Sequence, residues 1–317
     1  MKNISVLILE QSVLTGIVSL MDIFKMAGGY SGKKFNIEIV SSDGKPIKYS
    51  SVFQITPDRP ATKVKETDLI IIPSSGFRKR DLGSYPVKTL DWLRKHFEKG
   101  TKIAGCCTGV FMLAESGILN NKKATTHWAY ADLFRKRYPG TELISDNIIT
   151  EDGNILCSGG ASSVVDLYLF LIERYRGKKI ATKCAKNIVF ERGRHIQTPF
   201  ENFRHQKKHK DSDIIKAQGW IERYFNKEFQ IDDISNFVGM SIRNFKRRFK
   251  NATGDSPLVY IQKLRVEAAK NLLETTSSAI DEVARNVGYD DVGFFRKLFA
   301  RYAGLNPSLY RQKFKSM

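Results

Sequence analysis

The sequence predicts a chain of two parts, an α/β domain followed by an all-α domain. Up to about residue 175, short apolar runs rich in β-branched residues alternate with stretches of helical periodicity. From Ile214 onward the apolar residues follow helical spacing only. The last third of the chain also contains one sequence pattern twice, which indicates a duplicated supersecondary unit.

Length and composition exclude several classes of protein. The 317 residues, 42% hydrophobic and 27% charged, suffice for two or three globular domains and are too apolar for a disordered chain. No apolar run reaches the roughly 18 residues that a membrane-spanning helix needs, so no membrane partner is expected. The N-terminal MKNISVLILEQ is interpreted as a buried strand rather than a secretory signal. Four cysteines, two of them adjacent, favour a reducing compartment, the cytoplasm.

Positive charge is abundant but is spread along the chain. The formal net charge is +19, and the residues from Glu201 onward, 22 basic and 14 acidic, contribute +8 of it. Such an excess favours a polyanionic partner such as nucleic acid. Because the other +11 lies in the first 200 residues, net charge does not locate a binding surface.

The N-terminal part has the pattern of a mostly parallel sheet between helices. The predicted strands are Ile4–Leu9, Phe35–Ser41, Leu69–Pro73, Lys102–Cys106 and Ile155–Ser158. The predicted helices are Leu14–Ala27, Pro86–Lys99, Val110–Ser116, Tyr130–Arg137 and Ser163–Arg176. This alternation is typical of a flavodoxin-like fold with helices on both faces of the sheet. Glu151 and Asp152 are interpreted as a turn before the last strand.

The segment between the two parts indicates the domain boundary. A helical stretch, Lys178–Phe190, is followed by an irregular one, Arg192–Phe200, and then by the charged run Arg204–Asp213. That run has no apolar periodicity and is the best candidate for a solvated linker. We therefore predict a first domain over residues 1–200, a linker over 201–213 and a second domain over 214–317.

The duplicated pattern is centred on Gly239 and Gly288. Each glycine follows a short helical segment and precedes a second one, with one extra residue in the turn of the later copy. Both copies continue as Phe, four residues, Gly, two residues, Pro, two residues and Tyr, over Phe249–Tyr260 and Phe299–Tyr310. A helix that ends at a glycine able to adopt a left-handed conformation, followed at once by another helix, is a helix-turn-helix.

The second helix of each copy has an apolar face and a basic face. Ile242, Phe245 and Phe249 share the apolar face in the first copy, and Val292, Phe295, Leu298 and Phe299 in the second. Ser241 is the expected N-cap of the first of these helices, and a capping box from Ser278 to Asp281 is expected to open the helix before the other. Pro257–Glu274 is predicted to be a rigid spacer helix. The candidate DNA-contacting residues are Ser241, Arg243, Asn244, Lys246, Arg247, Lys250, Gly293, Arg296, Lys297 and Arg301.

Aromatic stripes and basic faces on single helices usually mean only a core and a solvated surface. That explanation does not account for two glycine-centred turns that are each followed by a basic helix. Residues 214–314 resemble the DNA-binding domain of the AraC/XylS family, above all in Val283-Ala-Arg-Asn-Val-Gly-Tyr with the following Phe295–Arg311 pattern. The resemblance implies two recognition helices in successive major-groove segments of double-stranded DNA. We expect the first helix to supply more base contacts, because it has more outward basic residues.

A cysteine occupies the junction of a strand and a helix in Lys102-Ile-Ala-Gly-Cys-Cys107-Thr108-Gly109. A thiol at the start of a helix is expected to gain thiolate character from the helix dipole, as in a nucleophile elbow. His127, twenty residues later in Thr-Thr-His-Trp, makes a candidate Cys–His pair with Cys107. The alternatives are a small buried side chain at Cys107 and a satisfied core histidine beside Trp128. Cys106 is expected to point away by strand alternation.

These segments resemble the PfpI-like, class I glutamine amidotransferase-like superfamily. The Cys-Thr-Gly elbow, the Leu-Ala-x-Ser-Gly helix end, Ala-Thr-Thr-His-Trp and the C-terminal helices together resemble GlxA-type regulators over nearly the whole chain. The resemblance places the loop Ile72-Pro73-Ser74-Ser75-Gly76 with a backbone N–H facing the elbow. Gln197-Thr-Pro-Phe200 resembles the connector of such regulators.

The first helix departs from the enzymes of this superfamily. Those enzymes place a glutamate there against the cysteine, whereas this helix has Thr15, Gly16 and Ser19 and no acid before Asp22. No clear third triad member follows His127. We therefore expect no catalytic residue, cofactor or metal, and a ligand pocket formed by Cys107, Thr108, His127, Ser75 and Trp128. Trp128 is a candidate cation-binding wall, although core packing is the more common use.

The sequence therefore predicts a sequence-specific DNA-binding transcription regulator whose first domain senses a small metabolite. The expected partners are double-stranded DNA, an unknown small-molecule effector, RNA polymerase and a second copy in a homodimer. By resemblance, the effector class is small nitrogenous metabolites such as amino acids and quaternary amines. Two alternatives remain open: a cysteine-dependent amidase or deglycase fused to a DNA-binding domain, and an architectural DNA-binding protein without an effector.

Overall fold

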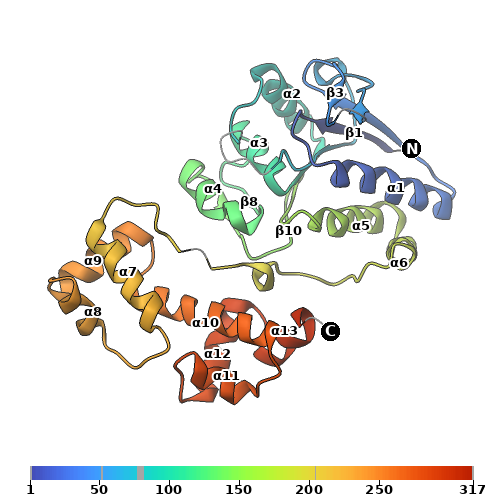
Figure 1. Ribbon diagram of the computed structural model, residues 1–317. Coiled ribbons are helices and arrows are strands. Elements are labelled where there is room, and N and C mark those ends of the chain that lie inside the picture. Colours follow the sequence, from blue (N-terminus) through green and yellow to red (C-terminus); the bar gives the residue numbers. More distant parts are fainter. Residues whose placement is uncertain (1, 51–52, 77–81, 204, 316–317) are drawn as a thin grey trace. The chain divides into compact units, whose positions relative to one another are not determined.

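The computed structural model describes residues 2–50, 53–76, 82–203 and 205–315. The chain divides into two compact units, Met1–Gln197 and Thr198–Met317 (Figure 1). The first unit contains every strand of the described residues, and the second contains only helices and their connections. The predicted fold class, an α/β domain followed by an all-α domain, is confirmed.

Among the described residues, seven strands form the main sheet in the order β10-β11-β7-β6-β1-β2-β5. All neighbours are parallel except β10, which runs antiparallel to β11. The strands are β1 (Lys2–Ile8), β2 (Phe35–Ser41), β5 (Arg59–Pro60), β6 (Leu69–Ile72), β7 (Lys102–Cys106), β10 (Ile149–Asp152) and β11 (Ile155–Ser158). The five predicted strands are all present, whereas β5 and β10 are additional.

The predicted turn at Glu151 and Asp152 is wrong, because both residues belong to β10. They pair with Leu156 and Ile155 of β11, and the turn lies after them, where Gly153 has a φ of +61°. The polar sequence of β10 has a physical reason. It is the edge strand of the sheet, and edge strands carry polar and charged side chains that buried strands exclude.

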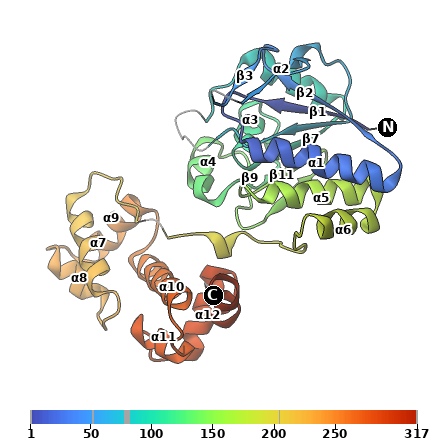
Figure 2. The same cartoon turned by 45° about the vertical axis from the view of Figure 1, so that its right-hand side comes forward.

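Helices cover both faces of the sheet. Three of them, α1 (Leu14–Ser31), α5 (Ser163–Arg176) and α6 (Lys178–Asn187), pack together over one face (Figure 2). The other face is covered by α2 (Val87–Glu98), α3 (Val110–Glu115) and α4 (Ala131–Arg137). Strand alternation divides the apolar side chains between two cores, so that Val6 packs under α1 while Leu7 packs on the opposite side. Two short strand pairs, β3 (Ile47–Lys48) with β4 (Gln54–Ile55) and β8 (Lys123–Ala124) with β9 (Glu142–Leu143), lie outside the main sheet.

The second unit contains seven α-helices within its described residues. They are α7 (Ser212–Tyr224), α8 (Ile231–Phe237), α9 (Ile242–Thr253), α10 (Pro257–Thr275), α11 (Ile280–Asn286), α12 (Val292–Ala303) and α13 (Pro307–Phe314). One hydrophobic core joins α7, α8 and α9 to the first half of α10, and another joins α11, α12 and α13 to its second half. In the described part of the chain, no helix is long and apolar enough to cross a membrane.

The duplicated pattern folds as two helix-turn-helix units, α8–α9 and α11–α12. The turns contain Gly239 with a φ of +65° and Gly288 with a φ of +91°, a backbone region that side chains disfavour. Ser241 is the N-cap of α9, as expected, although its side chain makes no capping bond. Two local expectations are wrong: α11 begins after Ala279 rather than Ser278, and Ile242 is 37% exposed rather than docked in the core. The Ser278 N–H donates to the Thr276 hydroxyl instead, while Asp291 caps α12 by accepting from Phe294 N–H.

Candidate functional sites

Helix α9 presents a dense positive surface. The side chains of Arg243, Lys246, Arg247 and Lys250 are exposed, and α9 contains no acidic residue. The opposite face buries Phe245 and Phe249 completely. Exposed cations without acidic neighbours on the same helix are suited to DNA phosphates and to the acceptors of guanine in the major groove.

Asn244 belongs to the same surface. Its Oδ1 accepts a hydrogen bond of 2.9 Å from the Arg247 guanidinium. An amide and a guanidinium held side by side match the donor and acceptor edges of adenine and guanine. The arrangement is consistent with base contacts from α9, which stay a prediction.

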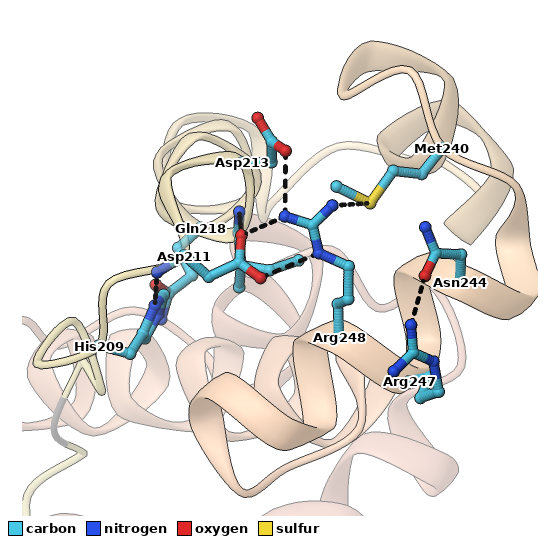
Figure 3. A network of polar contacts seen from close by, with 9 residues as sticks. His209, Asp211, Asp213, Gln218, Met240, Asn244, Arg247 and Arg248 are labelled. Atoms are coloured by element: carbon cyan, nitrogen blue, oxygen red, sulfur yellow. Dashed lines mark hydrogen bonds and ion pairs between the residues drawn. The ribbon is translucent and has the colours of Figure 1, made fainter.

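Arg248 is bonded to two carboxylates of the segment at the start of α7, whereas Arg247 bonds only within α9, to Asn244, among the described residues (Figure 3). Its Nε and Nη2 donate to the two carboxylate oxygens of Asp211 at 3.0 and 2.6 Å, and Nη2 also donates to Asp213 at 3.0 Å. A bidentate pair of this kind fixes orientation as well as distance. Arg248 therefore fastens α9 to the start of α7.

The Asp211 carboxylate also organises the segment before α7. It caps the helix by accepting from Ile214 N–H at 3.2 Å, and the Asp211 N–H donates to His209 Nδ1 at 3.2 Å. His209 Nε2 in turn lies 3.0 Å from Gln218 Oε1 on α7 (Figure 3). The run Arg204–Asp213 is predicted to be a solvated linker, and many of its side chains are exposed. Its last residues are nevertheless held against α7 by these bonds. Arg204 lies outside the described residues.

We expect Arg248→Ala to lower the thermal midpoint of the second unit at pH 7, and Arg247→Ala to leave it unchanged. The ion pair with Arg248 lowers the pKa of Asp211 below its ordinary 3.8. Stability from this pair is therefore present above pH 3.8 and is lost as the pH falls through the lowered pKa of Asp211. Calorimetry of the full chain should show the difference between the wild type and Arg248→Ala shrinking in acid. A difference that persists undiminished when Asp211 is protonated would contradict this role.

Helix α12 carries less free positive charge than α9. Arg296, Lys297 and Arg301 are exposed, but Arg296 pairs with Asp281 at 3.1 Å and Arg301 lies 5.7 Å from the centre of the Tyr302 ring. Gly293 is exposed at the start of the helix. The smaller free charge of α12 agrees with the prediction that α9 supplies more of the base contacts. That larger share stays a prediction.

Arg265 on α10 connects the two helix-turn-helix units. Its guanidinium donates to the carbonyl of Phe225 at 2.6 Å and to that of Lys227 at 2.9 Å, both in the loop after α7. It also donates to the carbonyl of Gly288, the turn glycine of the second unit, at 2.9 Å. The same guanidinium lies 4.9 Å from the centre of the Tyr289 ring. One side chain thus links the loop before the first unit to the turn of the second.

The cysteine turn has the geometry of an elbow. Cys107 has a φ of +54°, follows β7 directly and precedes α3. Its side chain has no exposed surface, and its carbonyl accepts from the Thr126 hydroxyl at 2.7 Å. Cys106 packs in the opposite core, under α1 and α5, as strand alternation predicts.

The backbone N–H of Ser75, in the loop predicted to face the elbow, already has an acceptor. Ser75 N–H donates to Thr108 Oγ1 at 2.9 Å, and Thr108 Oγ1 donates to the Gly76 carbonyl at 2.9 Å. Because a hydroxyl has one hydrogen, Ser74 is the donor in its 2.8 Å contact with Thr108. The amide that the resemblance places against the elbow is therefore already bonded to Thr108.

The expected thiolate character of Cys107 is wrong. Burial raises the pKa of this thiol to about 11, although the polar groups of Ser74 and Thr108 beside it oppose the rise. The desolvation free energy of a thiolate at a fully buried sulfur is larger than the stabilisation that the helix dipole gives it.

We expect Cys107 to resist alkylation. With a pKa of about 11, roughly one thiol in ten thousand is ionised at pH 7. Iodoacetamide should therefore modify Cys107 in the folded chain at least about a hundredfold more slowly than in the urea-unfolded chain. Mass spectrometry of peptides from timed reactions measures both rates. Rapid modification of Cys107 in the folded chain would contradict the buried, neutral thiol.

His127 and Trp128 lie beside the end of the first unit. His127 Nδ1 accepts from Ala129 N–H at 3.1 Å, so Nε2 carries the proton in the neutral imidazole. The main-chain N–H of Trp128 donates to Gln197 Oε1 at 3.3 Å. Gln197 Nε2 donates to the carbonyls of Thr126 and Ser145 at 2.8 and 2.6 Å. Gln197 is buried and thereby ties the connector to the His127 segment. The pairing of Cys107 with His127 stays a prediction.

Of the five predicted pocket residues, Ser75 lines a cleft of about 710 Å³ at the carboxyl ends of β1, β2 and β6. Cys107 and Thr108 are completely buried, and His127 and Trp128 do not line this cleft. A single pocket joining all five residues remains a prediction. No group of three or more His, Cys, Asp or Glu side chains in the described ranges is placed to hold a metal ion.

Comparison with known proteins identifies both units. The profile described as DJ-1/PfpI family matches residues 2–174, more than half of the chain. The chain belongs to the DJ-1/PfpI family. A second profile, described as a helix-turn-helix domain, matches residues 234–313. This member of the DJ-1/PfpI family therefore carries a helix-turn-helix domain after its α/β unit.

Two transcriptional regulators are similar to this chain over most of its length. The chain is 26% identical to the HTH-type transcriptional regulator GbdR of Pseudomonas aeruginosa, over 98% of this chain and 84% of that protein. It is 24% identical to the HTH-type transcriptional regulator GlxA of Rhizobium meliloti, over 70% of this chain and 68% of that protein. The crystal structure of an AraC family transcriptional regulator from Pseudomonas putida covers 59% of this chain and 100% of its own, with 20% identity and a TM-score of 0.52. That likeness shows the fold.

Proposed function

We propose that this protein is a sequence-specific DNA-binding transcription regulator. The observation that carries the proposal is the paired helix-turn-helix units, joined by Arg265, with four exposed basic residues on α9. The names of the GbdR and GlxA relatives support it. In this proposal residues 214–317 bind double-stranded DNA, 201–213 form the linker and 1–200 form a sensing domain. The regulator acts in the cytoplasm as a homodimer together with RNA polymerase.

The test is selection of a binding site from random-sequence DNA, followed by titration against the selected site at several salt concentrations. Arg243→Ala and Arg247→Ala should relax the base preference at one or two positions. Each cation that contacts a phosphate contributes about 0.9 to the salt slope, so Lys246→Ala and Lys250→Ala should flatten it. Lys95→Gln on α2, an exposed cation of the first unit, is the matched control. Failure to select any preferred sequence would contradict the proposal.

We infer that the first unit senses a small molecule rather than catalysing a reaction. Two observations support this: the Cys107 thiol is buried with a pKa raised to about 11, and Ser75 N–H is already bonded to Thr108. The resemblance adds that α1 has Thr15, Gly16 and Ser19 in the stretch where it implies a glutamate for the enzymes. The alternative, an amidase or deglycase, predicts turnover that Cys107→Ser abolishes. Stoichiometric binding of a metabolite without product, unaffected by Cys107→Ser, is the result expected of a sensor.

A further inference from the structure

Phe294, in the first turn of α12, places an aromatic ring on the outer face of that helix. It is 47% exposed, whereas the next residue, Phe295, has no exposed surface. Single exposed apolar side chains are common on proteins, so the exposure alone carries no argument. The neighbours of the ring do, because Lys297 and Arg301 follow it at helical spacings of three and seven residues and are also exposed. The ring therefore lies in line with two of the cations that are predicted to contact DNA.

The internal repeat shows which residue of the first unit corresponds to Phe294. Helices α9 and α12 both have twelve residues, both end at a glycine with a left-handed backbone, and both bury a phenylalanine at their fourth residue, Phe245 and Phe295. Their third residues, Asn244 and Phe294, therefore correspond. Asn244 lies on the outward surface of α9 with its amide bonded to Arg247, a pair suited to the edges of adenine and guanine. A phenyl ring thus replaces the amide at the same place in the second unit.

The ring of Phe294 is held in place by the protein itself. Its main-chain N–H donates to the Asp291 carboxylate at 2.9 Å, and its ring centre lies 5.8 Å from that of Tyr289, which is largely buried. Gly293, which corresponds to Arg243 of the first unit, is exposed and has no side chain to separate the ring from a partner. A side chain that is already ordered loses little conformational entropy on binding, so its contact adds more to the affinity.

The chemistry of the ring restricts what it can recognise. A phenyl group has no N–H or O–H to donate and no oxygen or nitrogen to accept, and in the major groove the apolar group on a base edge is the 5-methyl of thymine. The first residues of a recognition helix are those that reach base edges. Lys297 and Arg301 favour DNA over an apolar protein surface as the partner, because DNA pairs both cations with phosphates, whereas an apolar surface would remove them from water unpaired.

We propose that Phe294 recognises a thymine in the DNA segment bound by α12, through contact of its ring with the 5-methyl group. The two units then select bases by different means, α9 with hydrogen bonds from Asn244 and Arg247, and α12 with an apolar contact. Lys297 and Arg301 hold α12 on the phosphates beside that base. The inference rests on the proposed function and names the base and the chemical group through which α12 contributes to it.

The test measures the affinity of the full-length chain for its selected DNA site, in which single thymines are replaced by deoxyuridine. This replacement removes only the methyl group. The segment bound by α12 is the one whose base preference Arg247→Ala leaves intact. At one thymine of that segment, uracil should lower wild-type affinity about fourfold, the loss of one buried methyl group. Phe294→Ala should bind the thymine and uracil sites equally, and Phe294→Leu should keep about a twofold preference for thymine.

Phe53→Ala is the matched control, because it truncates a phenylalanine of the first unit that is 41% exposed, and it should keep the full preference for thymine. Each result is a ratio of two affinities of one preparation, so partial unfolding of a variant cancels. The inference would be overturned by a segment without a preferred thymine or by a wild type indifferent to uracil at every thymine of that segment. A preference for the methyl group that persists in Phe294→Ala would overturn it as well.

The same data separate this inference from the proposed function. A chain that selects no preferred DNA sequence refutes the regulator and with it the thymine contact. A chain that selects a site but shows no preference for the methyl group refutes only the role of Phe294.

Discussion

Replacing Arg265 with methionine is expected to reduce affinity for the selected DNA site about a hundredfold. The guanidinium donates to the carbonyls of Phe225 and Lys227 beside the first helix-turn-helix unit and to that of Gly288 in the second. A hydrogen bond from a charged group contributes about 1.5–3 kcal/mol, so the loss of three also lowers the free energy of unfolding by about 2 kcal/mol or more. Without this side chain, binding of one unit to DNA holds the other unit less firmly over its own DNA segment, so the second unit binds with a lower effective concentration.

The matched control for Arg265→Met is Lys263→Met on the same helix. Among the described residues, the Lys263 ammonium bonds only to Asp255, at 2.9 Å, within the first half of the second domain. We expect this variant to retain affinity within about threefold, since an ion pair of one half does not fix the other half. Arg265→Lys should fail to restore binding, because an ammonium cannot reach three carbonyls from one planar fork. Wild-type DNA affinity in Arg265→Met would show that the two units keep their spacing without it.

The C-terminal repeat shows what sequence can and cannot predict. The spacing from Phe249 to Tyr260, repeated from Phe299 to Tyr310, predicts both units because glycines, prolines and aromatic residues impose local geometry. Arg248 and Arg265 carry no such signal. Each is one more cation on an amphipathic helix, and their partners, Asp211 and Gly288, are fixed only by tertiary packing.

In the first unit, strand and helix periodicity predicts the parallel core of the sheet but not its edge. Strand β10 is polar because it is an edge strand, so periodicity gives it no apolar signal. The elbow at Cys107 is predicted from its sequence, whereas the pKa of its thiol depends on burial that no local pattern shows. The cleft that Ser75 lines is only partly predicted, since most of its lining comes from separate segments that packing brings together.

Replacing Gly109 with alanine is expected to unfold or severely loosen the first unit. A Cβ at this position would lie 2.5 Å from the Pro73 carbonyl oxygen and 2.6 Å from that of Ile72. Both obstacles are backbone atoms at the end of β6, so no side chain can turn away to make room. The start of α3 must move away from the sheet, at a cost of about 3 kcal/mol or more.

The matched control for Gly109→Ala is Gly29→Ala in α1. A Cβ on Gly29 meets no atom within 4 Å, and alanine in a helix is preferred over glycine by about 1 kcal/mol, so this variant should raise stability. Amide hydrogen exchange of the full chain separates the units: protection of β6 and β7 should fall in Gly109→Ala while that of α9 stays unchanged. Unchanged protection of β7 would mean that α3 can move without cost.

The same close approach explains why the elbow exists in a protein that we infer is not an enzyme. The chain must turn sharply after β7 to bring Gly109 against the carbonyls of Ile72 and Pro73, and Cys107 adopts its φ of +54° in that turn. Thr108 then bonds Ser74, Ser75 and Gly76 and fixes the loop after β6. Ser75 also lines a cleft of about 710 Å³ at the carboxyl ends of β1, β2 and β6, so the turn supports one wall of that cleft by packing. Cys107→Ala should therefore preserve the fold of the first unit, and Gly109→Ala should disrupt it.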